Sequence, residues 1–434
     1  MLEGDIADEE NRSRIKKEIV RENIYGVDIE KGAVDIARLR FWLAIIVDEK
    51  IPLPLPNLDY KIMQGNSLLE SFEGVPLDSL LYKDYNNLFN STQETLTALQ
   101  KSINEYYEPQ DPRAKNKIKK HISELVHVLL SDQGWSKADG TLEKLKVMQL
   151  DSTCEFFLWH TWFSDVFNRP AKQRFDIVIG NPPYIQLQDD GGKLAKMYKL
   201  AKFNTFNNMG DIYQLFYEKG IALLRKSGHL CYITSNKWMR AGYGETSRKY
   251  FAEQTQPKIL IDLAGEKVFE NATVDVNILL LQKAAYTQNT YALRGGLDCL
   301  ENRSGLLERK NEAVNIIFPG NSSWVILSPI EQRIKEKIEK VGVPLKDWDI
   351  QINYGIKTGC NEAFIIDKTK RDELIKQSPN SVDIIRPILR GRDIKRYSYD
   401  FADTYLLTVH NGIREKDIPP INIDDYPAVK AHLD

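Results

Sequence analysis

A strand–helix–strand pattern near the start of the chain is the feature that most constrains its fold. Residues 23–29 (NIYGVDI) favour a strand, residues 30–49 carry apolar side chains at three- and four-residue intervals, and residues 60–63 indicate a second short strand. The predicted helix over 30–49 should face the core. Two strands joined by a helix in this way usually lie parallel in one sheet. The pattern therefore predicts an α/β fold.

The same alternation returns after residue 170. Residues 175–180 (FDIVIG) are almost entirely apolar, which is typical of a strand buried on both faces. A helix is predicted over 211–226, and Gly228 is expected to supply its C-terminal stop. Further strands are predicted at 229–234, 258–264 and 276–282. Together these elements predict a Rossmann-like core over residues 1–285.

The remaining segments predict an insertion, a connector and a second domain. Residues 76–170 show no strand pattern, and the segment 116–130 within them is amphipathic with helical spacing. We therefore predict a helical insertion there, too long for an ordinary crossover connection. Residues 286–345 are expected to form a connector with a charged helix at 329–341, and residues 346–434 to begin a mixed α/β domain.

Composition narrows the class of protein. The 434 residues are 42% apolar and 28% charged, which is ordinary for a globular protein of two or three domains. The longest apolar run, at 41–47, is far shorter than the roughly 20 residues of a membrane helix, so we expect no membrane partner. Four cysteines without C-x-x-C spacing predict reduced thiols in a cytoplasmic protein and no metal cluster. The net charge of −2 means that any basic surface must be local.

The tetrapeptide Asn181-Pro182-Pro183-Tyr184 directly follows the apolar strand 175–180. In open parallel sheets, ligands bind just beyond the carboxyl ends of the strands. The Asn181 amide oxygen and the Pro182 carbonyl are adjacent acceptors, which match the two N–H donors of an exocyclic amino group. Accepting both hydrogens would free the nitrogen lone pair to attack an electrophilic methyl group, while Tyr184 offers a face for stacking. This chemistry needs no metal.

A purely structural interpretation of the tetrapeptide is a proline turn with an asparagine cap and a surface tyrosine. Either half of the motif alone would favour that interpretation. The complete motif directly after an apolar strand favours the chemical one.

The segment FDIVIGNPPYI resembles the catalytic motif of adenine-N6 DNA methyltransferases, class I enzymes that use S-adenosylmethionine. NIYGVDIEKGAVDIARLRFWLAI resembles the second-strand segment of the larger members, which belong to type IIG restriction–modification systems. The resemblance implies a site-specific DNA methyltransferase that transfers a methyl group to N6 of a flipped adenine, in a restriction–modification or related defence system. It implies double-stranded DNA as a partner, and leaves open a nuclease domain or subunit outside this chain.

Four residues are implied at the cofactor. In the resembling family, the acidic residue at the second-strand end binds the ribose hydroxyls, which here places Asp28 and the adjacent Ile29 at the cofactor. The alternative for Asp28 is a helix N-cap. KIMQGNSLLE resembles the third-strand motif, which implies an adenine contact by Asn66 and a neighbouring role for Ser67. Family members usually carry Asp where this chain has Asn66.

Two further residues are implied around the base. LAGEKVFENATVDVNILLLQK resembles the later motif whose aromatic residue, here Phe269, packs against the opposite face of the extruded base. The alternative is a phenylalanine of the core. GDIYQLFYEKGIALL resembles the stretch after the catalytic strand, in which Asp211 either touches the cofactor or braces the pocket.

Residues 353–367 and 384–397 resemble the start of the target-recognition domain of the same family. A basic cluster in the second segment fits phosphate contacts, with one or two arginines reading guanine edges. A solvated basic turn is the alternative. The residues implied in DNA binding are Lys357, Thr358, Arg390, Arg392, Lys395 and Arg396.

The family's glycine-rich loop is the motif that this chain lacks. That loop lies upstream of the strand ending at Asp28, and residues 1–25 contain no Gly-x-Gly. We therefore expect a chain truncated at both ends, without the first strand, whose sheet either has a gap, closes in an altered order or needs a partner. Two alternative functions stay open: a non-catalytic DNA-binding module with a methyltransferase-like fold, and a protein-glutamine N-methyltransferase.

Overall fold

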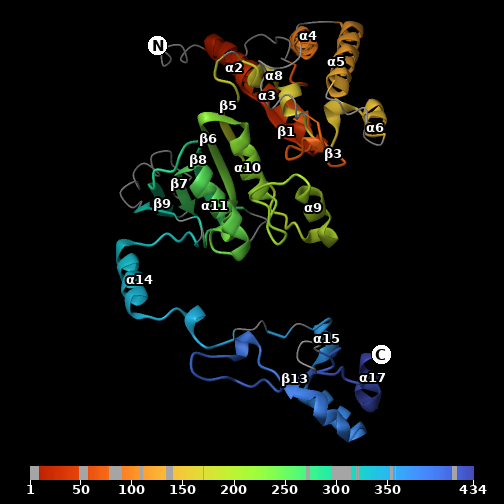
Figure 1. Ribbon diagram of the computed structural model, residues 1–434, viewed down its shortest axis with the longest axis vertical. Helices are drawn as coiled ribbons and strands as arrows, with labels where there is room; N and C mark the ends of the chain where they lie inside the picture. The colour runs from red at the N-terminus through yellow and green to blue at the C-terminus, as the bar shows by residue number, and fades with distance from the viewer. Residues whose placement is uncertain are drawn as a thin grey trace. The chain divides into compact units, whose positions relative to one another are not determined.

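The structure is a computed structural model in which the chain folds as two compact units, Met1–Ile338 and Glu339–Asp434. It describes residues 9–47, 57–77, 90–107, 111–132, 140–169, 171–269, 274–295, 314–318, 320, 322–351, 355–356, 358–412 and 418–434. Figure 1 labels the helices and strands of both units.

The first unit begins with the predicted strand–helix–strand element. After α2 (Glu9–Asn23), strand β1 (Gly26–Asp28) pairs in parallel with β2 (Ile62–Gln64), and α3 (Lys31–Ile46) connects them. The predicted βαβ unit is therefore confirmed. Only part of α3 faces a core, because Val34 and Ile45 are buried while three apolar residues are about half exposed, namely Ile36, Leu39 and Leu43.

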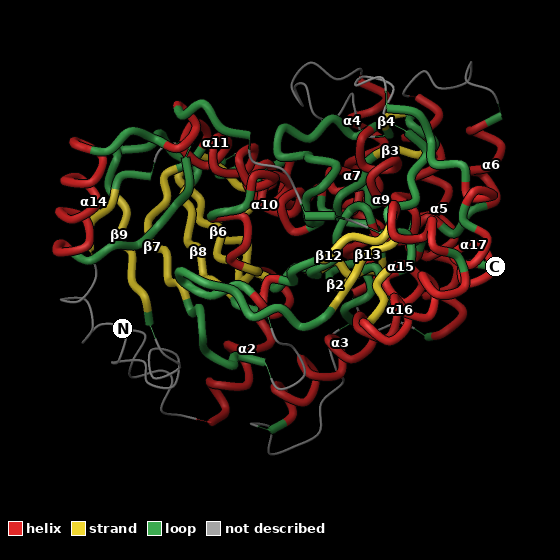
Figure 2. Tube along the Cα trace, turned by 90° about the horizontal axis from the view of Figure 1, so that it is seen from below, coloured by secondary structure: helices red, strands yellow, loops and turns green. Residues whose placement is uncertain are grey.

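A six-stranded mixed sheet forms the centre of this unit, in the order β10-β9-β7-β8-β6-β5. Its strands are β5 (Phe175–Gly180), β6 (Leu224–Ser235), β7 (Gln256–Asp262), β8 (Val276–Gln282), β9 (Thr290–Arg294) and β10 (Val314–Ile316). Figure 2 shows helices α10 (Tyr213–Leu223) and α11 (Glu245–Gln254) beside these strands. The mixed α/β class is confirmed, and the sheet extends past residue 285, where the predicted core ended.

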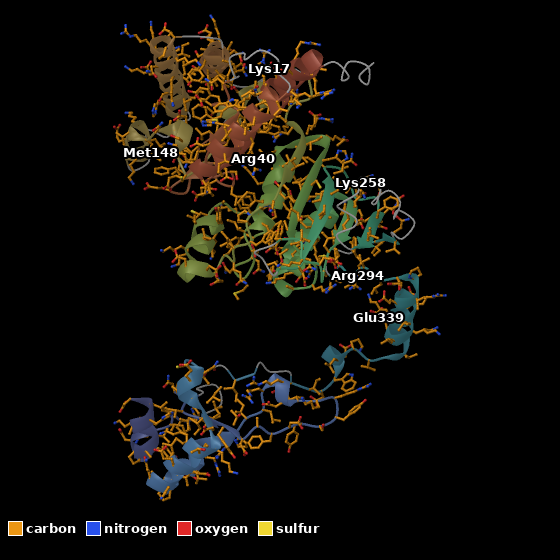
Figure 3. All side chains as sticks on the ribbon, turned by 180° about the vertical axis from the view of Figure 1, so that it is seen from behind. Lys17, Arg40, Met148, Lys258, Arg294 and Glu339 are labelled. Atoms are coloured by element: carbon orange, nitrogen blue, oxygen red, sulfur yellow. The ribbon has the colours of Figure 1, made fainter. Side chains whose placement is uncertain are left out.

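Strand directions bring several chain segments to one edge of this sheet. β6 runs parallel to β5, and β7 runs parallel to β9, while β8 is antiparallel to both β6 and β7. β5, β6, β7 and β9 therefore all end at the same edge. Figure 3 labels Lys258 near the start of β7 and Arg294 at the end of β9, which marks the direction of these strands.

The prediction that residues 175–180 are buried on both faces is wrong. β5 is an edge strand that pairs only with β6 among the described residues, and Ile177 and Ile179 are 66% and 76% exposed. Val178 points the other way and packs against the core. The β1–β2 pair forms a sheet of its own, so the described strands show a break between β1 and β5.

The predicted helix end at Gly228 is also wrong. Helix α10 ends at Leu223, and β6 already begins at Leu224, which is in register with Phe175 of β5. Cross-strand bonds explain the early end. The Ser227 N–H donates to the Lys283 carbonyl at 2.9 Å, and the Lys283 N–H donates to the Gly228 carbonyl at 2.9 Å, so the segment 224–228 is held as strand.

Helices dominate the segment between the two sheets, apart from a short hairpin of β3 (Ser71–Phe72) and β4 (Val75–Pro76). Helix α5 contains the segment 116–130 predicted as amphipathic. The helices there are α4 (Asn90–Tyr107), α5 (Pro112–Asp132), α6 (Thr141–Val147), α7 (Trp159–Trp162) and α8 (Ser164–Phe167). Their apolar faces share one core with β2, which joins the segment to the α/β part.

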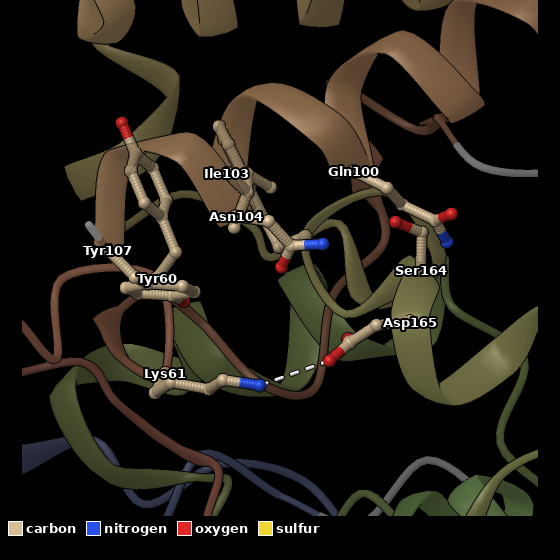
Figure 4. Close-up of a pocket in the computed structure, with 9 residues that line it drawn as sticks. Tyr60, Lys61, Gln100, Ile103, Asn104, Tyr107, Ser164 and Asp165 are labelled. Atoms are coloured by element: carbon tan, nitrogen blue, oxygen red, sulfur yellow. Dashed lines mark hydrogen bonds and ion pairs between the residues drawn. The ribbon is translucent and has the colours of Figure 1, made fainter. Parts of the chain in front are cut away.

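A polar contact fixes this helical segment to the start of β1. The Lys61 ammonium donates to the Tyr25 hydroxyl at 2.7 Å and to the Asp165 carboxylate at 3.0 Å, and the Tyr25 hydroxyl also donates to Asp165. Figure 4 shows Lys61 and Asp165 in a small pocket beside Asn104 and Tyr107 of α4. This pocket contains none of the predicted site residues, so we regard it as structural.

The second unit has its own small core. Strands β11 (Ile365–Asp367), β13 (Thr404–Leu407) and β12 (Ile385–Pro387) form an antiparallel sheet in that order. Helices α15 (Asn361–Phe364), α16 (Lys368–Gln377) and α17 (Pro427–Leu433) accompany it. The predicted mixed α/β character of this region is confirmed. Helix α14 (Pro329–Val341) contains the boundary between the two units and has no buried residue. Among the described residues, no helix has the length and apolarity that crossing a bilayer would require.

Candidate active site

The Asn181–Tyr184 loop begins where β5 ends, at the edge shared by the ends of β6, β7 and β9. Gly180, the last residue of β5, lies so close to its neighbour strand that an added Cβ would be 3.2 Å from the Tyr232 ring, which favours glycine there. Asn181 and Pro183 are exposed, Pro182 is buried and Tyr184 is half-buried. Asn181 is therefore open to solvent at the edge where a ligand was predicted.

The Tyr184 hydroxyl has two acceptors within reach. It donates to the Asn181 Oδ1 atom at 3.0 Å and lies 3.3 Å from the Ile233 carbonyl oxygen on β6. Burial, with a smaller contribution from Asp211, raises the pKa of Tyr184 to about 12, so this hydroxyl keeps its proton at neutral pH. Its contact orients the Asn181 amide and still leaves Oδ1 a second lone pair.

Phe269 lies on the same apolar cluster as Tyr184. Ile261, Leu263 and Val276 form the buried centre of this cluster, and both aromatic side chains pack against it as partly buried residues. Phe269 is in the connection between β7 and β8, which starts and ends at the carboxyl edge. The structure thus brings Phe269 to the catalytic motif, while its role as a base clamp stays a prediction.

A polar group lies beside this cluster at the end of β7. The buried Asp262 accepts a hydrogen bond from the Asn236 side-chain amide at 2.8 Å, and Arg240 lies 3.6 Å from its other carboxylate oxygen. Asn236 and Arg240 follow directly on β6. Sequence reasoning missed these residues, because their pairing depends on the antiparallel strand β8 that separates β6 from β7 in the sheet.

Asp211 is a buried carboxyl group next to the motif. Backbone contacts join the loop after Tyr184 to the segment around Asp211. The Ile212 N–H donates to the Ile185 carbonyl at 3.0 Å, and Gln186 and Asp211 form an antiparallel β-bridge. Asp211 is 8% exposed, and one of its carboxylate oxygens has no hydrogen-bond partner among the described residues. Burial raises the pKa of Asp211 to about 6, although three backbone N–H groups oppose the shift. Whether Asp211 contacts a cofactor or supports the loop stays a prediction.

Asp28 and Ile29 lie at the end of β1, next to the loop that follows β2. The Gly65 N–H donates to the Asp28 carbonyl at 2.9 Å, so the two predicted cofactor segments are neighbours. Asp28 is exposed, and its side chain accepts the Glu30 N–H at 2.8 Å at the start of α3. The N-cap residue of α3 is Glu30, so the N-cap alternative for Asp28 is wrong. Ile29 is half exposed and its carbonyl accepts from the Gln64 amide at 3.0 Å.

Asn66 is only 4% exposed, and its amide is engaged within the protein. Its Oδ1 accepts the Leu68 N–H at 3.2 Å, and its Nδ2 lies 3.4 Å from the Tyr198 hydroxyl on α9 (Asp189–Lys199). Ser67 is partly buried, and its carbonyl accepts the Trp159 indole N–H at 3.0 Å. The contact of Asn66 and Ser67 with a cofactor stays a prediction.

A buried ion pair connects the segment after β2 to helix α10. Glu70, six residues after β2, accepts from the Lys219 ammonium of α10 at 2.5 Å, and His160 lies 3.8 Å from its other oxygen. Burial alone would raise the pKa of Glu70, but the charge of the Lys219 ammonium holds it below its usual value. Burial lowers the pKa of His160 despite Glu70, so the imidazole is neutral at physiological pH.

In the second unit, the basic residues predicted to bind DNA differ in their contacts and exposure. Arg390 is committed to Asp393, with its Nε and Nη2 atoms 3.0 and 3.3 Å from the carboxylate oxygens. Arg392, Lys395 and Arg396 are exposed. Thr358 is partly buried and donates to Asn361 at 2.5 Å, and Lys357 lies outside the described residues. Their roles in DNA binding stay predictions.

Residues 22–269, more than half of the chain, match the family model described as the Eco57I restriction-modification methylase. This match spans β1, the segment after β2, the Asn181–Tyr184 loop and Phe269. The chain belongs to the Eco57I restriction-modification methylase family.

Several curated proteins are similar to this family member. The type II methyltransferase M.BstVI of Geobacillus stearothermophilus is 24% identical over 330 residues, which cover 70% of this chain and 54% of that protein. M.XhoI of Xanthomonas vasicola is 23% identical over 64% of this chain and 51% of its own length. The restriction enzyme and methyltransferase RM.Eco57I of Escherichia coli is 25% identical over 46% of this chain and 20% of its own. The chain spans about half the length of the first two.

Solved structures show a weaker likeness. The type IIL restriction–modification enzyme MmeI in complex with DNA aligns with a TM-score of 0.39 and 14% identity, over 72% of this chain and 38% of that one. The type IIG restriction endonuclease BpuSI aligns with a TM-score of 0.29 and 16% identity, over 62% and 34% of the two chains.

Proposed function

We propose that this chain carries the methyltransferase core of a site-specific DNA adenine-N6 methyltransferase that uses S-adenosylmethionine in a restriction–modification or related defence system. The observation that carries the proposal is the pair of adjacent acceptors, the exposed Asn181 and the buried Pro182, at the carboxyl edge of the sheet. Two aromatic residues, Tyr184 and Phe269, pack on one apolar cluster beside it. Family membership supports the same reaction class.

Residues at the end of β1 fit the ribose of S-adenosylmethionine. The exposed Asp28 carboxylate has acceptor capacity beyond the one backbone N–H that it binds, and ribose hydroxyls are donors. Ile29 offers an exposed apolar surface beside it. When bound, S-adenosylmethionine supplies an electrophilic methyl group. Asn66 fits less directly, because its amide is already engaged with Leu68 and Tyr198.

Asn181 and Pro182 act on the adenine amino group in this proposal. Each carbonyl oxygen accepts one N–H of N6, which draws the nitrogen from planar towards tetrahedral and localises its lone pair. Tyr184 keeps Asn181 in the accepting orientation and stacks against the base, while Phe269 encloses the other face. The amino nitrogen would form a bond to the methyl carbon while the methyl–sulfur bond of the sulfonium breaks and leaves a neutral thioether, and the nitrogen would release one proton to solvent. Catalysis would then depend on positioning.

Double-stranded DNA is the proposed substrate. A base held between Tyr184 and Phe269 cannot remain stacked in a duplex, so the adenine must be flipped out. The exposed basic residues Arg392, Lys395 and Arg396 of the second unit are proposed to bind the DNA backbone or base edges.

The decisive experiment measures transfer of a radiolabelled methyl group from S-adenosylmethionine to duplex DNA, followed by nucleoside analysis for N6-methyladenine. N181A should lose at least about 100-fold in single-turnover rate while DNA affinity stays near wild type, because its acceptor acts mainly in the transition state. N315A is the matched control, since Asn315 is an exposed asparagine on β10, at the other edge of the sheet.

Two outcomes would contradict the proposal in different ways. Near-normal turnover by N181A would refute the role of Asn181. Duplex binding without detectable S-adenosylmethionine binding or methyl transfer would instead favour a non-catalytic DNA-binding module. Transfer to a glutamine side chain of a protein, but not to DNA, would favour the protein methyltransferase alternative.

A further inference from the structure

A short β-hairpin in the second unit presents an arginine and a tyrosine at its tip. Ile394 and Tyr399 form an antiparallel bridge, the Asp400 N–H donates to the Asp393 carbonyl at 2.8 Å, and the Lys395 N–H donates to the Ser398 carbonyl at 2.9 Å. These bonds define the 393–400 hairpin, with Arg396 and Tyr397 as its two tip residues.

The tip residues are not the ones that a tight turn requires. Two-residue hairpin loops favour Asn, Asp and Gly, whose backbones accept positive φ angles. Neither Arg396 nor Tyr397 has a positive φ, so the backbone does not require these residue types. The turn therefore leaves the side chains at both positions available for contacts with a partner.

Both tip side chains are presented to solvent. Tyr397 is 88% exposed, and the Arg396 guanidinium lies over its ring at 5.2 Å from the centroid. Tyr399 and Ile394, which flank the tip on the two strands, are also exposed. A hairpin that exposes this much aromatic and apolar surface beside positive charge has the composition of a binding surface rather than of a solvated loop.

The base of the hairpin is held firmly. The Asp393 carboxylate, which is nearly buried, accepts the Arg390 backbone N–H at 2.9 Å and the Arg390 Nε at 3.0 Å. These bonds to Arg390 lower the pKa of Asp393, so the carboxylate stays ionised and the contact persists at neutral pH. Arg390 therefore orients the hairpin, whereas Arg396 is free of any such carboxylate contact among the described residues.

We propose that the 393–400 hairpin is a DNA-reading element that enters the major groove of a duplex, with Arg396 contacting a guanine edge and Tyr397 packing on bases or sugar beside it. The inference rests on the proposed function, because it assumes that the substrate is DNA. Residues 386–400, which include the whole hairpin, carry five basic side chains and two acidic ones in a chain of net charge −2, and Lys395 lies 3.6 Å from Asp400. The remaining positive charge makes this segment complementary to a polyanion. A two-stranded ribbon fits the width of the major groove, and arginine is the usual partner of guanine there.

Duplex binding by the whole chain tests this assignment. Affinity for fluorescein-labelled duplex DNA is measured by anisotropy at several salt concentrations for wild type, R396A, Y397A and the control R371A. Arg371 is also stacked on a tyrosine of the second unit, at 4.8 Å from the Tyr405 ring, but it is partly buried and paired with Asp372. The exposure of Arg396 and Tyr397 means that their variants should fold normally, which thermal unfolding checks.

R396A should weaken binding and reduce the slope of log affinity against log salt by about 1. Y397A should weaken binding about 5- to 30-fold with an unchanged salt slope, because its contribution is not ionic. R396K should keep the salt slope but lose sequence preference in selection from a random duplex pool, because lysine cannot form the bidentate contact.

Wild-type affinity in both R396A and Y397A would overturn the assignment and leave a protein-facing role for the hairpin. An equal loss in R371A would also overturn it, because the effect would then be general. Absence of duplex binding by the wild-type chain would refute the proposed function itself, which separates the two failures.

Discussion

The Tyr184 hydroxyl offers the sharpest test of how the candidate site works. Y184F keeps the aromatic ring on its apolar cluster but removes the one donor that orients Asn181. In the wild-type protein, the Tyr184 hydroxyl has one proton to donate and two acceptors within reach, the Asn181 Oδ1 atom at 3.0 Å and the Ile233 carbonyl oxygen at 3.3 Å. When an adenine amino group donates to Asn181 Oδ1, the Tyr184 hydroxyl can rotate and donate to the Ile233 carbonyl instead. We therefore expect the hydroxyl to preorganise the empty site rather than to compete with the substrate.

The size of the effect follows from the value of one hydrogen bond. A neutral, partly buried hydrogen bond contributes about 0.5–1.5 kcal/mol net, and about 1.4 kcal/mol corresponds to tenfold in rate. Y184F should therefore lower the rate of methyl transfer about 2- to 10-fold. The KM for DNA should change little, because the stacking surface of the ring remains.

Single-turnover methyl transfer at saturating DNA is the appropriate assay, with Y213F as the matched control. The Tyr213 ring lies 6.1 Å from that of Tyr184, edge to face, but its hydroxyl interacts with Tyr243 at 3.3 Å and not with Asn181. Y213F should retain the wild-type rate. A wild-type rate for Y184F, or a loss that appears only in DNA affinity, would refute the orienting role.

Three further predictions concern stability. Burial raises the pKa of Asp211 from 3.8 to about 6, so the folded protein binds this proton more tightly than the unfolded chain and loses stability as the pH rises from about 4 to 6. The D211N side chain does not titrate. The unfolding free energy of D211N minus that of wild type, measured in urea, should therefore be about 1–3 kcal/mol larger at pH 7.5 than at pH 3.5. K219M should destabilise the protein by about 3–5 kcal/mol, because it leaves the buried Glu70 carboxylate without its cation, and K219M/E70Q should recover part of that loss. I177T and I179T should each change the unfolding free energy by less than about 0.5 kcal/mol, because both side chains are exposed on the edge strand; a loss above about 1.5 kcal/mol in either would show that these residues are buried.

The sequence predicted the local elements well, because their signals are local. The helical spacing over 30–49 and the β-rich runs around it correspond to α3, β1 and β2, and the proline pair after an apolar run marks the end of β5. The position of β5 within the sheet could not be predicted in the same way. Its apolar residues have the composition of a central strand, but burial depends on what lies beside the strand, and on its outer side the described residues place none.

Contacts between side chains that are far apart in the sequence also could not be predicted from the sequence. Nothing in the residues around Glu70 indicates that Lys219 neutralises it, since the pair is formed 149 positions apart. The basic cluster near residue 390 was predicted from charge alone. The structure divides it into Arg390, which braces the hairpin through Asp393, and exposed side chains such as Arg396. Composition cannot separate these two uses of the same residue type.

The two halves of the proposed site lie beside separate sheets, and side-chain contacts fix the position of one half relative to the other. Asp28 ends β1 and Asn66 lies just after β2 of the two-stranded sheet, whereas the Asn181–Tyr184 loop follows β5 of the six-stranded sheet. The Glu70–Lys219 ion pair connects the segment after β2 to α10, which packs on β6, and Tyr25 and Phe175 join the starts of β1 and β5 with ring centroids 5.5 Å apart. Methyl transfer needs donor and acceptor aligned to a fraction of an ångström, so this ion pair should matter for rate as well as for stability. A fully folded K219M chain, measured well below its melting temperature, should therefore transfer methyl groups more slowly than wild type even at saturating S-adenosylmethionine and DNA.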